Sequence, residues 1–277
     1  MAGSLYLVAT PIGNLEDITL RALRILREEA SLIACEDTRQ TQKLLDHFEI
    51  RKQTVSYHDH NETSRTTELI AHLEAGESVA LLSDAGTPLI SDPGFRLLRA
   101  AIERDIPIIP IPGPSAAMTA MVGSGLPVAE FRFIGFLPPK SGARRRVLEE
   151  LAQEQTTMIF YESPHRLLES LEDVVAVLGD RPIAVARELT KLHEEFVRGS
   201  AKNVLEELRS RTSIKGEITV VLGAAQRSTA EGNPVEEVAK LQAAGVERMA
   251  AIKQVAKQFG LPKRELYRLV EGSANME

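Results

Sequence analysis

The stretch VALLSDAGTPLISDPG, residues 79–94, joins a short apolar run to a loop with two glycines, two prolines and two aspartates. Four apolar residues bounded by turn-forming residues are too few for a buried helix and are typical of a strand buried on both faces. Ligands of open parallel sheets bind beyond the carboxyl ends of the strands. The stretch therefore predicts a parallel sheet with a binding site at its edge.

Similar apolar runs recur in the first half of the chain, at Leu5–Ala9, Leu32–Cys35 and Pro107–Ile111. Helical periodicities lie between them, for example over residues 20–26 and 69–73. Strands that alternate with helices indicate an α/β fold with crossover helices. We therefore predict an N-terminal α/β domain over residues 1–124.

A second series of predicted strands begins near Phe131, after a glycine- and proline-containing break at Ser124–Pro127. The predicted strands are 131–136, 158–161, 183–186 and 218–222, and the predicted helices are about 142–154, 166–178 and 201–210. The pattern predicts a C-terminal α/β domain over residues 125–225, with the break as a hinge.

Past Gly223 the pattern changes to a small, polar segment and then to helical signals only. Pro234 stands where a first helical residue is favoured. Residues 250–256, Gly260 and the proline-started segment 262–270 have the order helix, glycine turn, helix. We therefore predict a small helix-turn-helix-like tail over residues 233–277.

Composition excludes several classes of protein. The net charge is −6, so the whole molecule is not a uniformly basic nucleic-acid binder. The single cysteine, Cys35, excludes an internal disulfide and a cysteine-rich zinc site. No phosphate loop and no dinucleotide-binding glycine motif follows a predicted strand. Without a membrane-length apolar run or a signal segment, we expect a cytoplasmic protein.

The loops after three predicted strands are rich in glycine and proline, at Thr10–Leu15, residues 83–94 and Pro112–Ala116. Glycine has no side chain, so a ligand can approach its backbone closely. Proline restricts the conformations of the unbound loop, which lowers the entropy lost on binding. We expect the three loops to form one cleft for a flat, neutral or cationic small molecule. Asp84 could face a positive centre, and Ser115 with the following amide could reach a carboxylate.

Five motifs resemble, in this order, those of the tetrapyrrole methylase superfamily. They are LVATPIGNL (7–15), EDTR (36–39), SDAGTP (83–88), PGPSA (112–116) and YESPHR (161–166). The likeness covers residues 5–223, and the tail resembles an appended helix-turn-helix of that family. The resemblance implies two α/β domains of tetrapyrrole methylase type with S-adenosylmethionine in the cleft between them, in a homodimer.

The resemblance is to the ribosomal branch of that superfamily. The glycine-rich first loop and the G-D-P of the third-strand loop, frequent in the superfamily, are replaced here by Ala9–Gly13 and Ser83–Ala85, which argues against a corrin or porphyrin substrate. The implied reaction is 2′-O-methylation of a cytidine in the decoding region of 16S rRNA, within the small ribosomal subunit. The implied cofactor-binding residues are Pro11, Asp84, Thr87, Ser115, Ala116, Tyr161, Arg187 and Leu222.

A ribose hydroxyl is a poor nucleophile, so a nearby base should accelerate its methylation by about 10²- to 10⁴-fold. The candidate catalytic residues follow predicted strands, and none is assigned as the base: Glu36, Asp37, Arg39, Glu162, His165 and Glu188. The segment 36–39 could instead be a solvated turn, and Glu162 and Glu188 could instead form inter-domain salt bridges with their neighbouring cations. His58 and His60 lack a third ligand at a recognisable spacing, so we expect no metal site.

Local cationic patches are the candidate RNA contacts. One is KSGARRR, from which we select Lys140, Arg144, Arg145 and Arg146. The tail carries six basic residues and one acid between Arg248 and Arg268, and contributes Lys263 and Arg264. Two alternatives stay open: a methyltransferase of the same superfamily that acts on a tetrapyrrole or a protein, and a non-catalytic module that binds rRNA.

Overall fold

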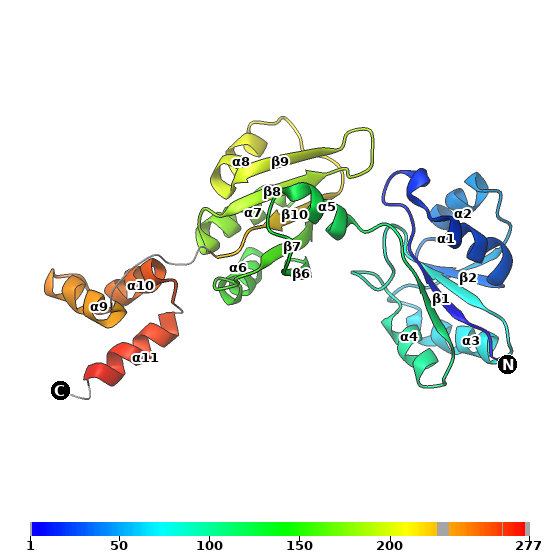
Figure 1. Ribbon diagram of the computed structural model, residues 1–277, viewed down its shortest axis with the longest axis horizontal. Helices are drawn as coiled ribbons and strands as arrows, with labels where there is room; N and C mark the ends of the chain where they lie inside the picture. Colours follow the sequence, from blue (N-terminus) through cyan, green and yellow to red (C-terminus); the bar gives the residue numbers. More distant parts are fainter. Residues whose placement is uncertain (1, 226–232, 262, 275–277) are drawn as a thin grey trace.

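The structure is a computed structural model that describes residues 2–225, 233–261 and 263–274. It contains two α/β lobes, each built on a five-stranded sheet, and a group of C-terminal helices (Figure 1). The predicted fold class, two α/β units with a helical tail, is thereby confirmed. Within the described residues, no helix combines the length and the apolar character that a membrane crossing requires.

The first lobe contains an entirely parallel sheet with the strand order β3-β2-β4-β1-β5. Its strands are β1 (Leu5–Val8), β2 (Leu32–Cys35), β3 (Gln53–Ser56), β4 (Val79–Leu82) and β5 (Ile108–Ile111). The helices α1 (Leu20–Arg24), continued by a π-helical turn (Ile25–Glu29), and α2 (Thr38–His47) pack on one face. The helices α3 (Glu62–Glu74) and α4 (Phe95–Ile102) pack on the other.

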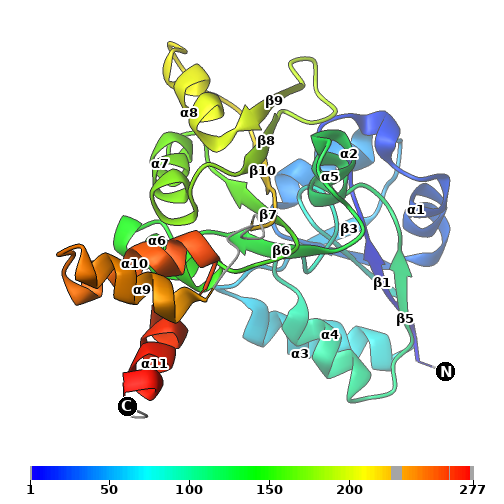
Figure 2. The ribbon, with the colours of Figure 1, turned by 60° about the vertical axis from the view of Figure 1, so that its left-hand side comes forward.

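The second lobe contains a mixed sheet with the strand order β6-β7-β10-β8-β9, in which β6 and β7 are parallel and the other neighbours antiparallel. Its strands are β6 (Phe131–Phe136), β7 (Thr157–Glu162), β8 (Pro182–Arg187), β9 (Glu195–Ser200) and β10 (Ile218–Leu222). One face is covered by α6 (Ser141–Glu150), α7 (Leu167–Leu178) and α8 (Ala201–Arg209) (Figure 2).

The other face of the second sheet is covered by α5 (Ala116–Ser124), which the sequence prediction placed in the first domain. Ala117, Ala120 and Met121 of this helix share a buried cluster with residues of β7, β8 and β10. The first lobe instead ends at β5 and the loop that follows it. By its packing, α5 belongs to the second lobe, and the chain passes between the lobes at residues 112–115.

The tail comprises α9 (Pro234–Ala243), α10 (Arg248–Phe259) and α11 (Lys263–Ala274), which lie beyond α6 at the end of the molecule away from the first sheet (Figure 1). Its buried residues, including Val238, Ile252 and Leu266, form a cluster of their own. Gly260 ends α10 in the left-handed conformation, with φ of +62°, as expected for the glycine of a helix-turn-helix. Pro262, predicted to begin the last helix, lies outside the described residues.

The loop after β4 needs its two glycines. Gly86 and Gly94 have φ values of +87° and +133°, which other residues rarely adopt. Gly113 has no such φ, but a side-chain carbon there would lie 2.8 Å from the Cβ of Ala9. Positive φ therefore explains the need for Gly86 and Gly94, and the close approach of Ala9 explains the need for Gly113.

Candidate active site

A cavity of about 390 Å³ lies where the loops of the two lobes meet. The first lobe contributes Ile12 from the loop after β1 and residues of the loop after β4, from Asp84 to Asp92. The second lobe contributes the start of α5, the carboxyl ends of β6 and β7, and the beginning of β10. The volume is in the range of small-molecule sites in proteins.

Hydrogen bonds between loops fix the first wall of this cavity. Thr10 and Gly86 exchange two backbone hydrogen bonds, of 2.9 and 3.0 Å, which join the loops after β1 and β4. The Thr87 hydroxyl donates to the carbonyl of Pro114 at 3.1 Å, which adds the loop after β5. The three loops that were expected to converge therefore do so.

Asp92 lines the cavity although the sequence analysis did not select it. No hydrogen-bond donor to its carboxylate occurs among the residues that the structure describes. Burial raises the pKa of Asp92 to about 6, and the negative charges of Glu36 and Asp84 contribute. Burial and Asp84 likewise raise the pKa of Glu36. The cavity therefore has an acidic wall that favours a positive charge or a proton.

The loop that carries Asp92 is strained. Leu89 and Ser91 have φ values of +73° and +66°, a conformation that costs non-glycine residues of order 1–3 kcal/mol each. Such strain persists where the surrounding structure imposes it, and it concentrates at functional sites. The available signal for Asp92 was its position in the sequence: it is the second aspartate of the loop after β4 and stands directly before Pro93 and Gly94.

The EDTR motif lies beside the cavity and does not line it. Asp37 caps α2 by accepting from the backbone NH of Arg39 at 2.8 Å, and its carboxylate pairs with the Arg39 side chain at 2.9 Å. These hydrogen bonds lower the pKa of Asp37 to about 2, which makes it a poor base at neutral pH. The Asp37 NH also donates to the carboxylate of Asp84 at 3.0 Å, which orients that side chain.

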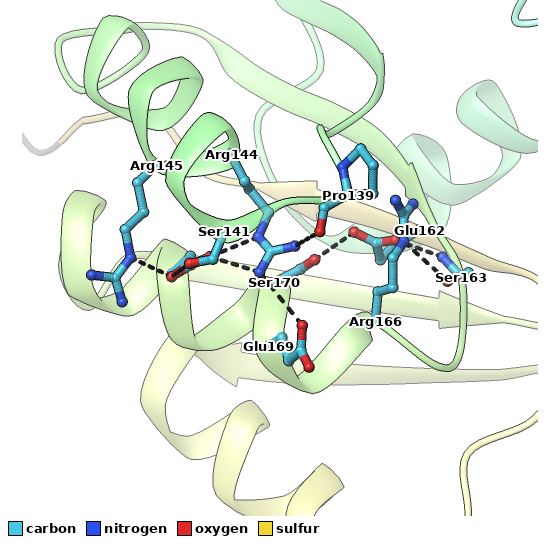
Figure 3. A network of polar contacts seen from close by, with 10 residues as sticks. Pro139, Ser141, Arg144, Arg145, Glu162, Ser163, Arg166, Glu169 and Ser170 are labelled. Carbon is cyan, nitrogen blue, oxygen red and sulfur yellow. Dashed lines mark hydrogen bonds and ion pairs between the residues drawn. The ribbon is translucent and has the colours of Figure 1, made fainter.

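Glu162 lines the cavity, but its carboxylate is buried and engaged (Figure 3). It accepts hydrogen bonds from the NH of Ser163 at 2.8 Å and the hydroxyl of Ser170 at 2.5 Å, and pairs with Arg166 at 2.6 Å. These contacts fix the loop after β7. His165, in the same loop, is exposed and does not reach the cavity lining.

Glu188 lies at the rim and is also paired. It contacts the Lys191 ammonium at 2.8 Å and accepts from the NH of Glu217 at 3.0 Å, and these hydrogen bonds lower its pKa. A side-chain carbon at Gly13 would lie only 2.4 Å from Cγ of Lys191, so the two lobes touch here. In the described part of the chain, no cluster of three or more His, Cys, Asp or Glu residues is arranged to hold a metal ion.

Five predicted cofactor-binding residues line the cavity together: Asp84, Thr87, Ser115, Ala116 and Tyr161. Pro11 precedes Ile12, which also lines it. Arg187 lies at the corresponding end of β8, but its guanidinium pairs with Glu195 at 2.5 Å. The role of these residues in cofactor binding remains a prediction.

The structure places Leu222 away from the cavity. Because β10 runs antiparallel to β7, its first residue Ile218 lies opposite Glu162, whereas Leu222 lies opposite Met158 at the far end of the sheet. Ile218 and Thr219 line the cavity instead. The prediction for Leu222 is corrected accordingly, since strand direction could not be inferred from an apolar run.

Arg144, predicted to contact RNA, is completely buried. Its guanidinium donates to Asp173 at 2.7 Å and to the carbonyl of Pro139, and the hydroxyl of Ser141 donates to the same carboxylate at 2.9 Å (Figure 3). Arg145 also pairs with Asp173, at 2.5 Å. Burial opposes ionisation, but these three donors keep the pKa of the aspartate below its ordinary value. Arg144 therefore stabilises the fold and cannot reach RNA.

The other predicted RNA contacts are accessible. Lys140 and Arg146 are exposed at the start of α6, and the Arg145 side chain is about half exposed although paired. Lys263 and Arg264 are exposed at the start of α11. These accessible cations thus form two groups, one at the start of α6 and one on the tail.

Comparison with known sequences gives consistent matches. Residues 4–205 match the family model of the tetrapyrrole (corrin/porphyrin) methylases. The chain is 49% identical to the ribosomal RNA small subunit methyltransferase I of Halalkalibacterium halodurans, over 96% of this chain and 94% of that protein. It is also 49% identical to the protein of the same name from Synechocystis sp., over 96% of this chain and 97% of the relative.

Solved structures share the fold. Uroporphyrin-III C-methyl transferase from Thermus thermophilus, in complex with S-adenyl homocysteine, aligns with a TM-score of 0.57 at 20% identity, over 80% of this chain and 97% of that chain. A conserved hypothetical protein from Aeropyrum pernix K1 aligns with a TM-score of 0.63 at 20% identity, over 96% of this chain and 99% of the other. At such identities the likeness is one of fold.

We expect Asp173→Ala to lower the free energy of unfolding by about 3–5 kcal/mol, because it leaves Arg144 buried and without its carboxylate. Glu172→Ala is the matched control: its partner Arg209 is about half exposed, and such pairs contribute about 0–1 kcal/mol. Urea unfolding of both variants measures the difference. Equal stabilities would contradict the structural role given to Arg144.

Proposed function

Because the chain belongs to the tetrapyrrole (corrin/porphyrin) methylase family, we propose that it transfers the methyl group of S-adenosylmethionine to the RNA of the small ribosomal subunit. The acceptor we propose is the 2′-oxygen of a cytidine in the decoding region of 16S rRNA. The main support is the near-full-length similarity to relatives named ribosomal RNA small subunit methyltransferase I.

The cavity residues fit the proposed cofactor, whose sulfonium supplies an activated methyl group. Asp84 and Asp92 provide negative charge for a cationic centre. The backbone NH groups at the start of α5, beside Ser115, suit a carboxylate. Ile12 and Tyr161 provide apolar surface for an aromatic ring. These groups bind and orient, and alignment alone can supply up to about 7–11 kcal/mol of the barrier reduction.

We assign Asp92 as the group that accepts the proton of the ribose hydroxyl. In the proposed transfer, the Asp92 carboxylate would take the hydroxyl proton while the new oxygen–carbon bond forms. Bound S-adenosylmethionine would supply the methyl group and leave as a neutral thioether. Asp37, Glu162 and Glu188 are each paired with a cation, whereas no described residue donates a hydrogen bond to Asp92. A base with a pKa of about 6 is ionised at neutral pH.

Exposed cations and apolar edges suit the proposed partners. Lys140 and Arg146 are exposed at the start of α6 on the second lobe, and cations there can contact phosphates of the RNA. An apolar cavity of about 790 Å³ lies along the edge strands β5 and β6, where Met118 and Phe131 are each 39% exposed. We include a homodimer in the proposal, since a second copy could cover this apolar surface.

Deletion of the gene should remove one 2′-O-methyl mark from small-subunit RNA, and the purified protein with S-adenosylmethionine should restore it on subunits from the deleted strain. Mapping of 2′-O-methyl positions in both RNAs measures this. If the methyl group instead appeared in a small molecule or a protein, with the RNA unchanged, the result would support a methyltransferase of the same superfamily that acts on a tetrapyrrole or a protein. Binding of RNA without any methyl transfer would support a non-catalytic module.

Asp84→Ala should weaken S-adenosylmethionine binding by at least fivefold, since a charge-assisted hydrogen bond contributes about 1–3 kcal/mol. Calorimetric titration measures the dissociation constant, and circular dichroism checks the fold. Glu103→Ala, at the exposed end of α4, is the control and should bind normally. An unchanged dissociation constant for the Asp84 variant would exclude the proposed cofactor contact.

Asp92→Asn should lower kcat by about 10²- to 10⁴-fold while S-adenosylmethionine still binds. In the wild type, kcat/KM for small subunits should fall about tenfold per pH unit below pH 6, because the carboxylate then becomes protonated. The titratable groups around it are Glu36, Asp84 and Tyr161. The residual activity of the Asn variant should not show this fall in kcat/KM below pH 6. If the fall persisted in the variant, the titration would belong to another group.

A further inference from the structure

Phe136, the last residue of β6, is a large apolar side chain that lines the cavity and yet is 55% exposed. No other part of the cavity lining presents an aromatic ring so openly within the described residues. Exposed aromatic surface of this kind is unfavourable in water and is typical of places where a ligand or a partner binds.

A β-bulge directs this ring toward the cavity. The register between β6 and β7 shifts by one residue between Phe133 and Gly135, so that Phe133 lies opposite Ile159 and Phe136 opposite Tyr161. Residues two apart on β7 share one face of the sheet. Phe133 and Phe136, although three apart, therefore share that face as well. Gly135, with φ of +75°, permits the bulge.

Tyr161 supports the ring from one side. The rings of Phe136 and Tyr161 meet edge to face, with centroids 5.5 Å apart and an interplanar angle of 60°. Phe133 also contacts Tyr161 edge to face, with ring centroids 5.1 Å apart. The rings of Phe133 and Tyr161 pack against the buried cluster that includes residues of α5, whereas Phe136 is not part of that cluster. Phe136 is thus held in place and keeps free surface.

The loop after β4 lies across from the bulge. A side-chain carbon at Gly135 would be 3.6 Å from Oγ of Ser91, and Ser91 and Asp92 line the cavity beside Phe136. The space is therefore bounded by a flat apolar ring on one side and by polar groups on the other. Lys140, four residues further along the chain, is exposed.

From this geometry we propose that Phe136 is the stacking platform for the base of the target nucleotide, which enters the cavity between this ring and the loop of Ser91 and Asp92. The proposal rests on the proposed function. Proteins that recognise RNA by sequence do so mainly through unstacked bases, which they stack on aromatic side chains. In this arrangement the sugar of the stacked nucleotide lies on the side of Asp92.

The test compares three variants of the full-length protein, with S-adenosylmethionine and small subunits from cells that lack the gene. Phe136→Leu removes the flat ring and keeps apolar bulk, so kcat/KM for subunits should fall about 5- to 150-fold, the effect of losing one base stack. Phe136→Tyr keeps the ring and should behave as the wild type. Phe95→Leu, an exposed phenylalanine outside the cavity lining, should also be unaffected.

Calorimetry with S-adenosylmethionine separates the base from the other flat ring that could stack there, the adenine of the cofactor. Phe136→Leu should leave the cofactor dissociation constant unchanged. If Phe136→Leu bound the cofactor more weakly but methylated subunits with normal kinetics, the ring would be assigned to adenine and the proposal overturned. A variant unchanged in both measurements would also overturn it. A wild type that methylates no small-subunit RNA would refute the proposed function itself, and the platform with it.

Discussion

The cavity depends on the adjacency of β1 and β4 in a parallel sheet. Parallel neighbours end at the same edge, so the loops that follow them emerge side by side, and here they are joined by the backbone pair of Thr10 and Gly86. The tie from Thr87 to Pro114 then attaches the segment that leads into the second lobe. One wall of the site is therefore determined by sheet topology, before any side chain contacts a ligand.

Much of this arrangement could be predicted from the sequence. Apolar runs marked four strands of the first sheet, and the glycine and proline residues after three of them marked the loops that converge. Two strands were missed, β3 and β9, because their sequences QTVS and EFVRGS are not apolar runs and they lie at sheet edges. The direction of β10 was also inaccessible, because an apolar run predicts burial and does not specify orientation. That is why Leu222 was placed at the wrong end.

The error at Arg144 has a different cause, and the sequence held part of the information needed to avoid it. Three consecutive arginines suggest a solvated face, but in a helix Arg144 lies on the same side as Leu148, which is buried. The aspartate that neutralises it is distant in sequence, on α7, and no local pattern indicates that pairing. Asp92 was missed for a related reason: its environment is created by Glu36 and Asp84, which approach it only in the folded chain.

The tail has a consequence for how the molecule meets a large partner. Its apolar residues are buried among themselves in one small cluster, and a unit of about 40 residues with so little core is marginally stable by itself. Any ligand that binds only its folded form adds to its stability by mass action. Folding of this segment and binding of a partner at Lys263 and Arg264 would then be thermodynamically linked. A partner bound there would protect the three helices of the tail against unfolding.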